Sequence, residues 1–302
     1  MNTSQPTKST LLVAWTVVIL ASSLPKVILQ EIFGKTVSAD QQAVMSLSVI
    51  LVALLATLIG RSLRGLRPLL GLFTVLIGSQ WLVYSRIDEL SKYPIWLHHP
   101  SFNVSMLAEE SLNIMITLLV IAALLLMGKK PKDFYLAIGD IAAPTEPIRW
   151  LGVKEGDRWN KFGIWLSVFI SLGTLTFLVI GGHPPLDIVI KALPFLPAIL
   201  LAAALNAFTE EITYKASFLS VLESPVGKRQ AVYMVAAYFG LMHFYGIPYG
   251  VIGVLLAAFM GWLLAKSMQE TRGLFWAWFI HFLQDVWIFA FLAIGSIIPG
   301  GG

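Results

Sequence analysis

The sequence has no cysteine, which excludes disulfide bonds, thiolate chemistry and zinc sites built from cysteine ligands. Charge is also scarce, because only 13% of the residues are charged, compared with roughly 25% in soluble domains. The HExxH motif of zinc proteases is absent. There is also no basic patch interleaved with aromatic residues, the usual sign of a nucleic-acid-binding surface. These absences argue against a soluble domain and against a nucleic-acid partner.

Apolar residues take the place of the missing charge, with 57% hydrophobic residues and a mean hydropathy of +0.78. A helix needs about 17 to 25 apolar residues to cross a bilayer. About nine runs approach this length, and the third and seventh are short: Leu11–Gln30, Gln42–Gly60, Pro68–Tyr84, Leu112–Gly128, Phe162–Gly181, Ala192–Leu219, Ala231–Tyr245, Tyr249–Ala265 and Gly273–Ile298. Because lipid offers no partner to free backbone groups, each run should be helical. We predict an all-α polytopic membrane bundle of about eight to nine transmembrane helices.

Lysine and arginine are concentrated in alternate connections between these runs, for example in the group Lys129, Lys130 and Lys132. By the positive-inside rule these connections are cytoplasmic, which predicts a cytoplasmic amino terminus and, with nine spans, an external carboxyl terminus. The net charge of +4 then reflects topology and contact with anionic lipid headgroups. We therefore expect an integral protein of the cell membrane, with the lipid bilayer as a partner.

One long polar segment, residues 129–161, is rich in proline, glycine and charge. We predict that it is a cytoplasmic linker, with Trp150 and Trp159 at headgroup depth. It would divide the chain into an amino-terminal region of four helices, residues 1–128, and a five-helix membrane unit, residues 162–302. The amino-terminal region carries no recognisable motif, so its role is not predicted.

Ionisable side chains inside spans cost about 2.5 to 3.5 kcal/mol each on insertion scales, so each one suggests a functional site. We place Glu31, Glu109 and Glu110 at the edges of spans, where their side chains can reach the interface. The ionisable groups in span interiors, apart from Lys26, all follow Ala192. They are Glu210, Glu211, Lys215, His243, His281 and Asp285.

These interior groups occur at helical spacing. Residues four apart share one face of a helix, which applies to three pairs: Glu211 with Lys215, Phe239 with His243, and His281 with Asp285. The spacing indicates that each pair faces a common neighbour, which favours one shared site. Taken singly, each histidine could be a hydrogen-bonding residue between helices, and Glu211 with Lys215 a structural ion pair.

Glu210 differs from its neighbour because adjacent residues lie about 100° apart around a helix. The simplest assignment pairs Glu211 with Lys215 and leaves Glu210 separate, with Asn206 and Tyr214 one turn away on either side. A carboxylate held apart from a counter-ion in a low-dielectric site can accept a proton near neutral pH. Glu210 is therefore our candidate for a general base.

Three short motifs, "EEITYK", "FGLMH" and "HFLQD", follow one another over about 75 residues. They resemble the EExxxR, FxxxH and HxxxN/D motifs of the CAAX-protease and bacteriocin-processing family of membrane proteins. The resemblance covers roughly residues 162–298. It implies a glutamate-dependent membrane endopeptidase, a class that includes enzymes trimming prenylated CAAX proteins and bacterial relatives cutting other peptides.

The resemblance also assigns roles to the motif residues. Glu210 and His243 would activate the hydrolytic water, while His281 and Asp285 would surround the developing oxyanion. The second glutamate of the first motif, Glu211, and the cation that follows it would support them. The resemblance implies neither a metal nor another cofactor.

Two positions depart from the family pattern. Lys215 stands where the family usually has arginine, and an ammonium cannot form the planar bidentate pair of a guanidinium, although it still offers a cation to Glu211. Asp285 stands where asparagine is common, and it can donate to an oxyanion only when protonated. Its alternative role is to orient His281.

Two other functions use the same residues. A zinc-dependent metalloprotease could draw ligands from the two histidines and the carboxylates, of which His281 and Asp285 have ligand spacing. A transporter or a non-catalytic scaffold could use the buried acids as a proton relay or as structural contacts. For the endopeptidase, we expect a hydrophobic or lipid-modified peptide or protein substrate. The sequence does not predict whether it is prenylated, nor the oligomeric state.

Overall fold

The computed structural model describes residues 6–87 and 93–297, and within these ranges the regular elements are helices, with no strand. The predicted last span ends at Ile298, which lies just outside the described residues. The described elements are helical, and several of them are long and apolar enough to cross a membrane. The predicted all-α membrane fold is therefore confirmed.

The first half of the chain supplies the following elements: α1 (Lys8–Leu20), α2 (Leu24–Val27), η1 (Ile28–Ile32), α3 (Ala39–Ile59), η2 (Arg61–Leu66), α4 (Arg67–Arg86), α5 (Tyr93–Leu97) and α6 (Phe102–Leu126). The second half supplies η4 (Pro131–Phe134), η5 (Arg149–Leu151), α7 (Trp159–Gly182), α8 (Leu186–Ala192), η6 (Leu193–Phe195), α9 (Leu196–Glu210), η7 (Glu211–Ala216), α10 (Ser217–Val226), α11 (Lys228–Met242), α12 (Val251–Thr271) and α13 (Phe275–Ile297).

Seven helices in the described ranges are long and apolar enough to cross a membrane, and an eighth span is possible if α1 and the segment after it count as one. That pair is bent by 53°, at a break followed by Pro25, so the predicted first span is not straight. The predicted seventh span corresponds to α11, whose 15 residues extend about 22 Å, less than the hydrocarbon thickness. The count is near eight, and the chain is an integral multi-pass membrane protein.

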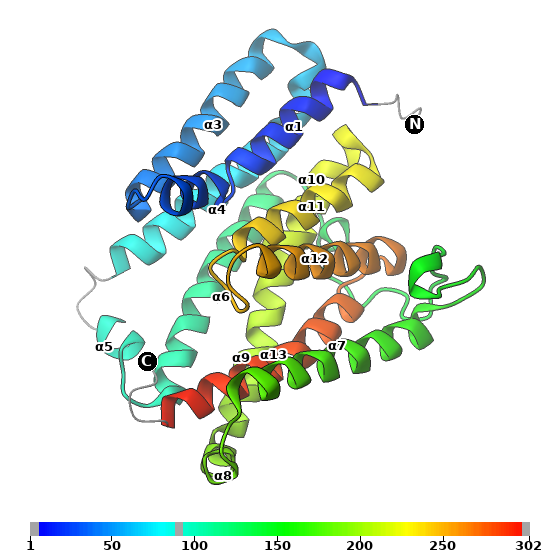
Figure 1. The fold of residues 1–302 in the computed structure, drawn as a ribbon. Helices are drawn as coiled ribbons and strands as arrows, with labels where there is room; N and C mark the ends of the chain where they lie inside the picture. The colour runs from blue at the N-terminus through cyan, green and yellow to red at the C-terminus, as the bar shows by residue number, and fades with distance from the viewer. Residues whose placement is uncertain (1–5, 88–92, 298–302) are drawn as a thin grey trace.

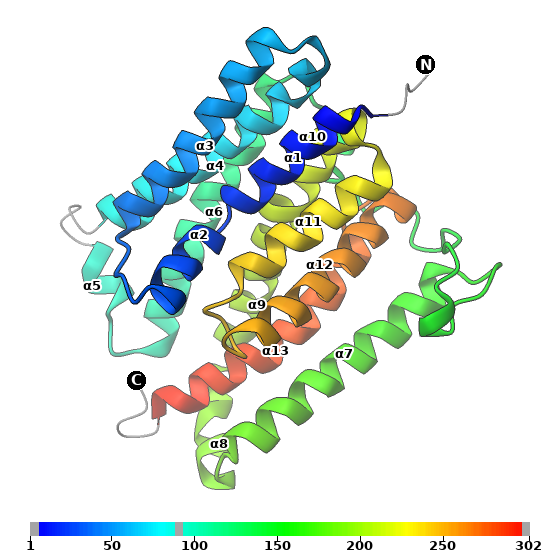
Figure 2. The same cartoon turned by 45° about the horizontal axis from the view of Figure 1, so that its top comes forward.

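Two groups of helices lie side by side in Figures 1 and 2. In the first, α3 packs against α4, and α1 contacts both α3 and α11. In the second, α13 packs between α7 and α9, while α11 runs along α12. The long helix α6 contacts α4 on one side and α9 on the other. It therefore joins the amino-terminal helices to those that carry the motifs.

The predicted linker is packed against the protein at several points. Trp159 is fully buried and its indole donates a 2.7 Å hydrogen bond to Glu270, whereas we expected it at headgroup depth. Trp276 at the start of α13 donates to the backbone of Ile141. Gly139 passes so close to the backbone of Gly273 that any side chain there would collide with it. The segment thus anchors the beginning of α13, the helix that carries the third motif.

Candidate active site

The first motif lies where a membrane helix changes its winding. Glu210 is the last residue of α9, and the next six residues form the π-helical turn η7 before α10 continues the span. Such turns are uncommon and often occur at functional sites, because the wider winding redirects side chains. Within the turn, Glu211 and Lys215 are fully buried and form an ion pair of 2.7 Å. The predicted pairing of these two residues is confirmed.

The second glutamate also contacts the third motif. His281 on α13 places Nδ1 2.7 Å from Glu211 Oε1. A carboxylate only accepts, so Nδ1 carries the proton and the ring orientation is fixed. The other ring nitrogen, Nε2, then lies 3.7 Å from Glu210 Oε2 and 3.5 Å from Asp285 Oδ1. One imidazole thus meets both glutamates of the first motif.

The arrangement explains how lysine serves in place of arginine. Glu211 Oε1 receives both Lys215 and His281, while Oε2 is buried without a hydrogen-bond partner among the described residues. A guanidinium could reach both oxygens of the carboxylate, whereas an ammonium reaches one. The lysine therefore neutralises Glu211 but leaves part of its hydrogen-bonding capacity unused.

Phe239, the first residue of the second motif, lies at the centre of the three motifs. The Lys215 ammonium is 3.4 Å from the centroid of its ring, which is close enough for a cation–π contact. The same ring lies 4.3 Å from the ring of His243 and meets the ring of His281 edge-on at 6.4 Å. Sequence reasoning placed Phe239 on the face of His243 but did not predict its contact with the lysine.

His243 lies at the carboxyl end of α11. Its Nδ1 is 2.7 Å from the backbone oxygen of Phe239, one turn earlier. A carbonyl only accepts, so Nδ1 is again the protonated nitrogen, and in the neutral ring Nε2 is an acceptor. The described contacts of His243 include no direct hydrogen bond to Glu210. Any joint action of these two residues would have to run through a molecule between them.

Asp285 is held from a second helix. Asn206 of α9, one turn before Glu210, donates a 2.9 Å hydrogen bond to Asp285 Oδ2. Asp285 is 4% exposed and His281 7% exposed, so both lie inside the bundle. The shorter contact to His281 comes from Glu211, which makes Glu211 the main residue orienting that ring. The role of Asp285 beside an oxyanion stays a prediction.

Sequence reasoning missed Glu110. We expected it at a span edge, but α6 begins at Phe102, so Glu110 lies inside the helix and is 2% exposed. Its carboxyl group accepts a long, 3.4 Å hydrogen bond from Asn113. A sequence signal was the polar Thr117, seven residues later on the same helix face. In the structure Thr117 forms a 2.8 Å hydrogen bond with Thr213 of η7.

The six predicted site residues fall into two groups. Five of them, Glu210, Glu211, Lys215, His281 and Asp285, are joined by contacts of 2.7–3.7 Å. The sixth, His243, is joined to them through the ring of Phe239. Within residues 6–87 and 93–297, no group of three or more histidine, aspartate and glutamate side chains is arranged to hold a metal ion.

Comparison with known families identifies the same part of the chain. Residues 192–287 match the family described as type II CAAX prenyl endopeptidase Rce1-like, and this segment contains all six predicted site residues. The match covers less than half of the chain. Comparisons with curated proteins and with solved structures found no match. The resemblance to the CAAX-protease and bacteriocin-processing family is therefore confirmed over residues 192–287, and the family indicates a protease.

Proposed function

We propose that the protein is a glutamate-dependent membrane endopeptidase that hydrolyses a peptide bond in a hydrophobic or lipid-modified substrate. The observation that carries the proposal is the position of Glu210. Its Oε2 is buried without a hydrogen-bond partner among the described residues, and it faces His281, whose other nitrogen is held by Glu211. Buried polar atoms in native proteins usually have a partner, so an unpaired one suggests a ligand.

In this mechanism Glu210 acts as the general base. As the oxygen of a water molecule bonds to the carbonyl carbon of the substrate, Glu210 takes a proton from that water. The Nε2 of His243, an acceptor when the ring is neutral and Nδ1 donates to Phe239, would orient the same water. General base catalysis of this kind contributes about 10² to 10⁴ in rate. When the tetrahedral intermediate collapses and the carbon–nitrogen bond breaks, Glu210 returns the proton to the leaving amine.

His281 would stabilise the oxyanion of the intermediate through Nε2. Because Glu211 already accepts the proton on Nδ1, the ring can donate from Nε2 only as an imidazolium. The carboxylates of Glu211 and Asp285 favour that charged form. A donor aimed at an oxyanion in a site with little water contributes about 10² to 10³ in rate.

The buried ion pair would support these groups without touching the substrate. Lys215 offsets the charge of Glu211, which allows the carboxylate to stay ionised inside the membrane and hold His281. The ring of Phe239 covers the ammonium on another side. The geometry of the site therefore depends on residues outside the reacting centre.

Substitution of purified protein tests the proposal. Glu210→Gln and His243→Ala should abolish cleavage of a mixture of synthetic apolar peptides in detergent while the thermal unfolding curve is retained. Glu155→Gln, which changes an exposed carboxylate in the connecting segment, is the matched control and should cleave like the wild type. Cleavage that persists in Glu210→Gln would refute the assigned base. Cleavage that disappears with a strong chelator and returns with zinc would favour the metalloprotease instead.

We further propose that the protein lies in the cell membrane with a cytoplasmic amino terminus. The support is the placement of lysine and arginine in alternate connections. Because the chain has no cysteine, a single cysteine introduced at Lys132 would report its side of the membrane without background. In the Lys132→Cys variant, the introduced cysteine should react with a membrane-impermeant thiol reagent only after the cells are opened. Labelling of this variant in intact cells would contradict the orientation.

A further inference from the structure

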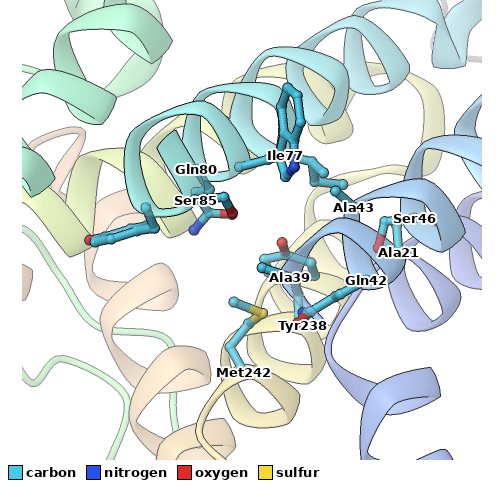
Figure 3. Close-up of a pocket in the computed structure, with 12 residues that line it drawn as sticks. Ala21, Ala39, Gln42, Ala43, Ser46, Ile77, Gln80, Ser85, Tyr238 and Met242 are labelled. Atoms are coloured by element: carbon cyan, nitrogen blue, oxygen red, sulfur yellow. The ribbon is translucent and has the colours of Figure 1, made fainter. Parts of the chain in front are cut away.

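A cavity of about 200 Å³ lies between the amino-terminal helices and α11. Most of the residues that line the cavity lie outside residues 192–287, the segment that matches the family. Its lining comes from α3, α4, α11 and the turn after α1. Figure 3 shows Gln80 and Ser85 on one side of the cavity and Tyr238 and Met242 on the other. The cavity is thus built by both halves of the chain.

The lining combines polar and apolar groups and carries no formal charge. Gln42, Ser46, Gln80, Ser85 and Tyr238 supply amide and hydroxyl groups, and the other described lining residues carry no formal charge at neutral pH. The hydroxyl oxygen of Ser85 is buried and has no hydrogen-bond partner among the described residues. Such a lining suits peptide amides and neutral side chains, because a charged group would lose its hydration without gaining a counter-ion.

The cavity borders the candidate active site at three residues. Met242 directly precedes His243 in the chain. Gln80 donates a 2.8 Å hydrogen bond to the hydroxyl of Tyr214 in the π-helical turn η7. Tyr84, a third lining residue, donates a hydrogen bond to Asn113 of α6, whose amide donates to the buried Glu110. A group bound in the cavity would therefore lie beside the segments of α11 and η7 that adjoin His243 and Glu210.

From these observations we infer that the cavity binds the side chain of one uncharged substrate residue near the scissile bond. The inference rests on the proposed endopeptidase function. The size is appropriate, because an apolar cavity of about 150 Å³ in another protein holds a benzene molecule. The pocket gives the amino-terminal helices a role in substrate selection. It predicts that acidic and basic residues are excluded at this one position of the substrate.

Filling the cavity tests the inference. Ala43 of α3 is buried and lines the cavity, so Ala43→Phe places a ring inside it, while the neighbouring Val44 is 63% exposed on the outer face of the same helix. A mixture of synthetic peptides, varied at each position around an apolar centre, serves as substrate. Mass spectrometry of the products then gives the residue preference at each position around the cleaved bond.

We expect the wild type to prefer one uncharged residue of intermediate size at a single position. In Ala43→Phe, the preference for glycine and alanine at that substrate position should rise at least tenfold, and the preferences at the other positions should not change. The control variant Val44→Phe should show the same preferences as the wild type. Thermal unfolding of all three proteins checks that they are folded. An unchanged profile in Ala43→Phe, or an equal loss for every peptide, would overturn the inference.

Capture of peptides gives a second readout that does not require cleavage. A benzophenone-bearing residue at Ser46, in the Glu210→Gln background, should crosslink peptides from the same mixture, and Ala43→Phe should reduce the yield at least fivefold. Capture combined with an inactive wild type would uphold the cavity and overturn the endopeptidase. Cleavage without capture would overturn the cavity alone, and the absence of both would overturn both proposals. Capture of phospholipid in place of peptide would also overturn the inference.

Discussion

Two ion pairs in this chain have the same spacing and opposite surroundings. Asp187 and Lys191 on α8 are four residues apart, 3.1 Å from each other, and both side chains are at least 60% exposed. Glu211 and Lys215 in η7 are also four apart, at 2.7 Å, and both are fully buried. Exposed pairs contribute little to stability, whereas loss of one partner from a buried pair leaves an uncompensated charge. Helical spacing therefore identifies a pair, and burial decides what depends on it.

The largest effect should follow from removing the buried cation. Lys215→Met keeps the side-chain length but leaves the Glu211 carboxylate with His281 as its remaining partner. We expect a loss of about 3 kcal/mol in unfolding free energy, the lower end of the range for broken buried pairs, because His281 still compensates part of the charge. Equilibrium unfolding in mixed micelles measures this free-energy difference. Peptide cleavage should fall at least a hundredfold, because without Lys215 the Glu211 carboxylate is no longer held in the ionised form that orients His281.

Lys215→Arg is the matched control for that variant. The guanidinium can approach the second, unpaired oxygen of Glu211, so cleavage should stay within tenfold of the wild type. Equal activity losses in the methionine and arginine variants would show that the packing of lysine, and not its charge, supports the site.

Removing the ring that covers the ammonium should have a smaller effect. Phe239→Leu keeps an apolar side chain but loses the contact with Lys215, and a desolvated cation–π contact contributes about 2 kcal/mol. Thermal unfolding should therefore shift less than in Lys215→Met. In a double-mutant cycle, Phe239→Leu should cost about 2 kcal/mol less once Lys215→Met is present, because only its packing against the two histidine rings is then lost. Additive losses would contradict the proposed contact.

Neutralising the buried Glu110 should not destabilise the protein, in contrast to removing Lys215. The described side-chain hydrogen bond of Glu110 comes from a neutral amide, that of Asn113. In Glu110→Gln the neutral amide can still bond Asn113, and no ionisable group is left at this buried position. We expect unfolding stability to be unchanged or higher, because no buried charge is left unpaired. Cleavage should change by less than tenfold, because Glu110 is not in the reacting centre. A clear loss of stability in unfolding measurements would show that Glu110 has a cationic partner.

The smallest effect should come from the exposed pair. Lys191→Ala removes the partner of Asp187 at the surface, where solvent already screens both charges. Neither thermal unfolding nor cleavage should differ measurably from the wild type. A loss comparable to that of Lys215→Met would mean that spacing, and not burial, determines the importance of these pairs.

Much of the fold could be predicted because the physical constraint is strong. Long apolar runs have few alternatives to helices in lipid, and the pair Glu211 with Lys215 follows from one helical turn. The short α11 was counted as a span because its apolar run continues through Tyr245 into the turn after the helix. The break in the first span comes from a local bend that hydropathy does not register.

The site was harder to predict because its main contacts join distant segments. The hydrogen bond from His281 to Glu211 spans 70 residues, and that from Asn206 to Asp285 spans 79. Periodicity places such residues on a face but not opposite a particular partner. Glu110 was misplaced because an acidic residue lowers local hydropathy, so the apolar run was started after it although α6 begins earlier.

The most direct test of the central claim compares protein ends generated in membranes. Membranes with wild-type protein, with Glu210→Gln and with Lys191→Ala, at equal protein levels and in the presence of a strong chelator, are analysed for new amino termini by mass spectrometry. The account predicts a common set of new termini in the wild type and Lys191→Ala that is absent from Glu210→Gln. The same termini in all three membranes would contradict it.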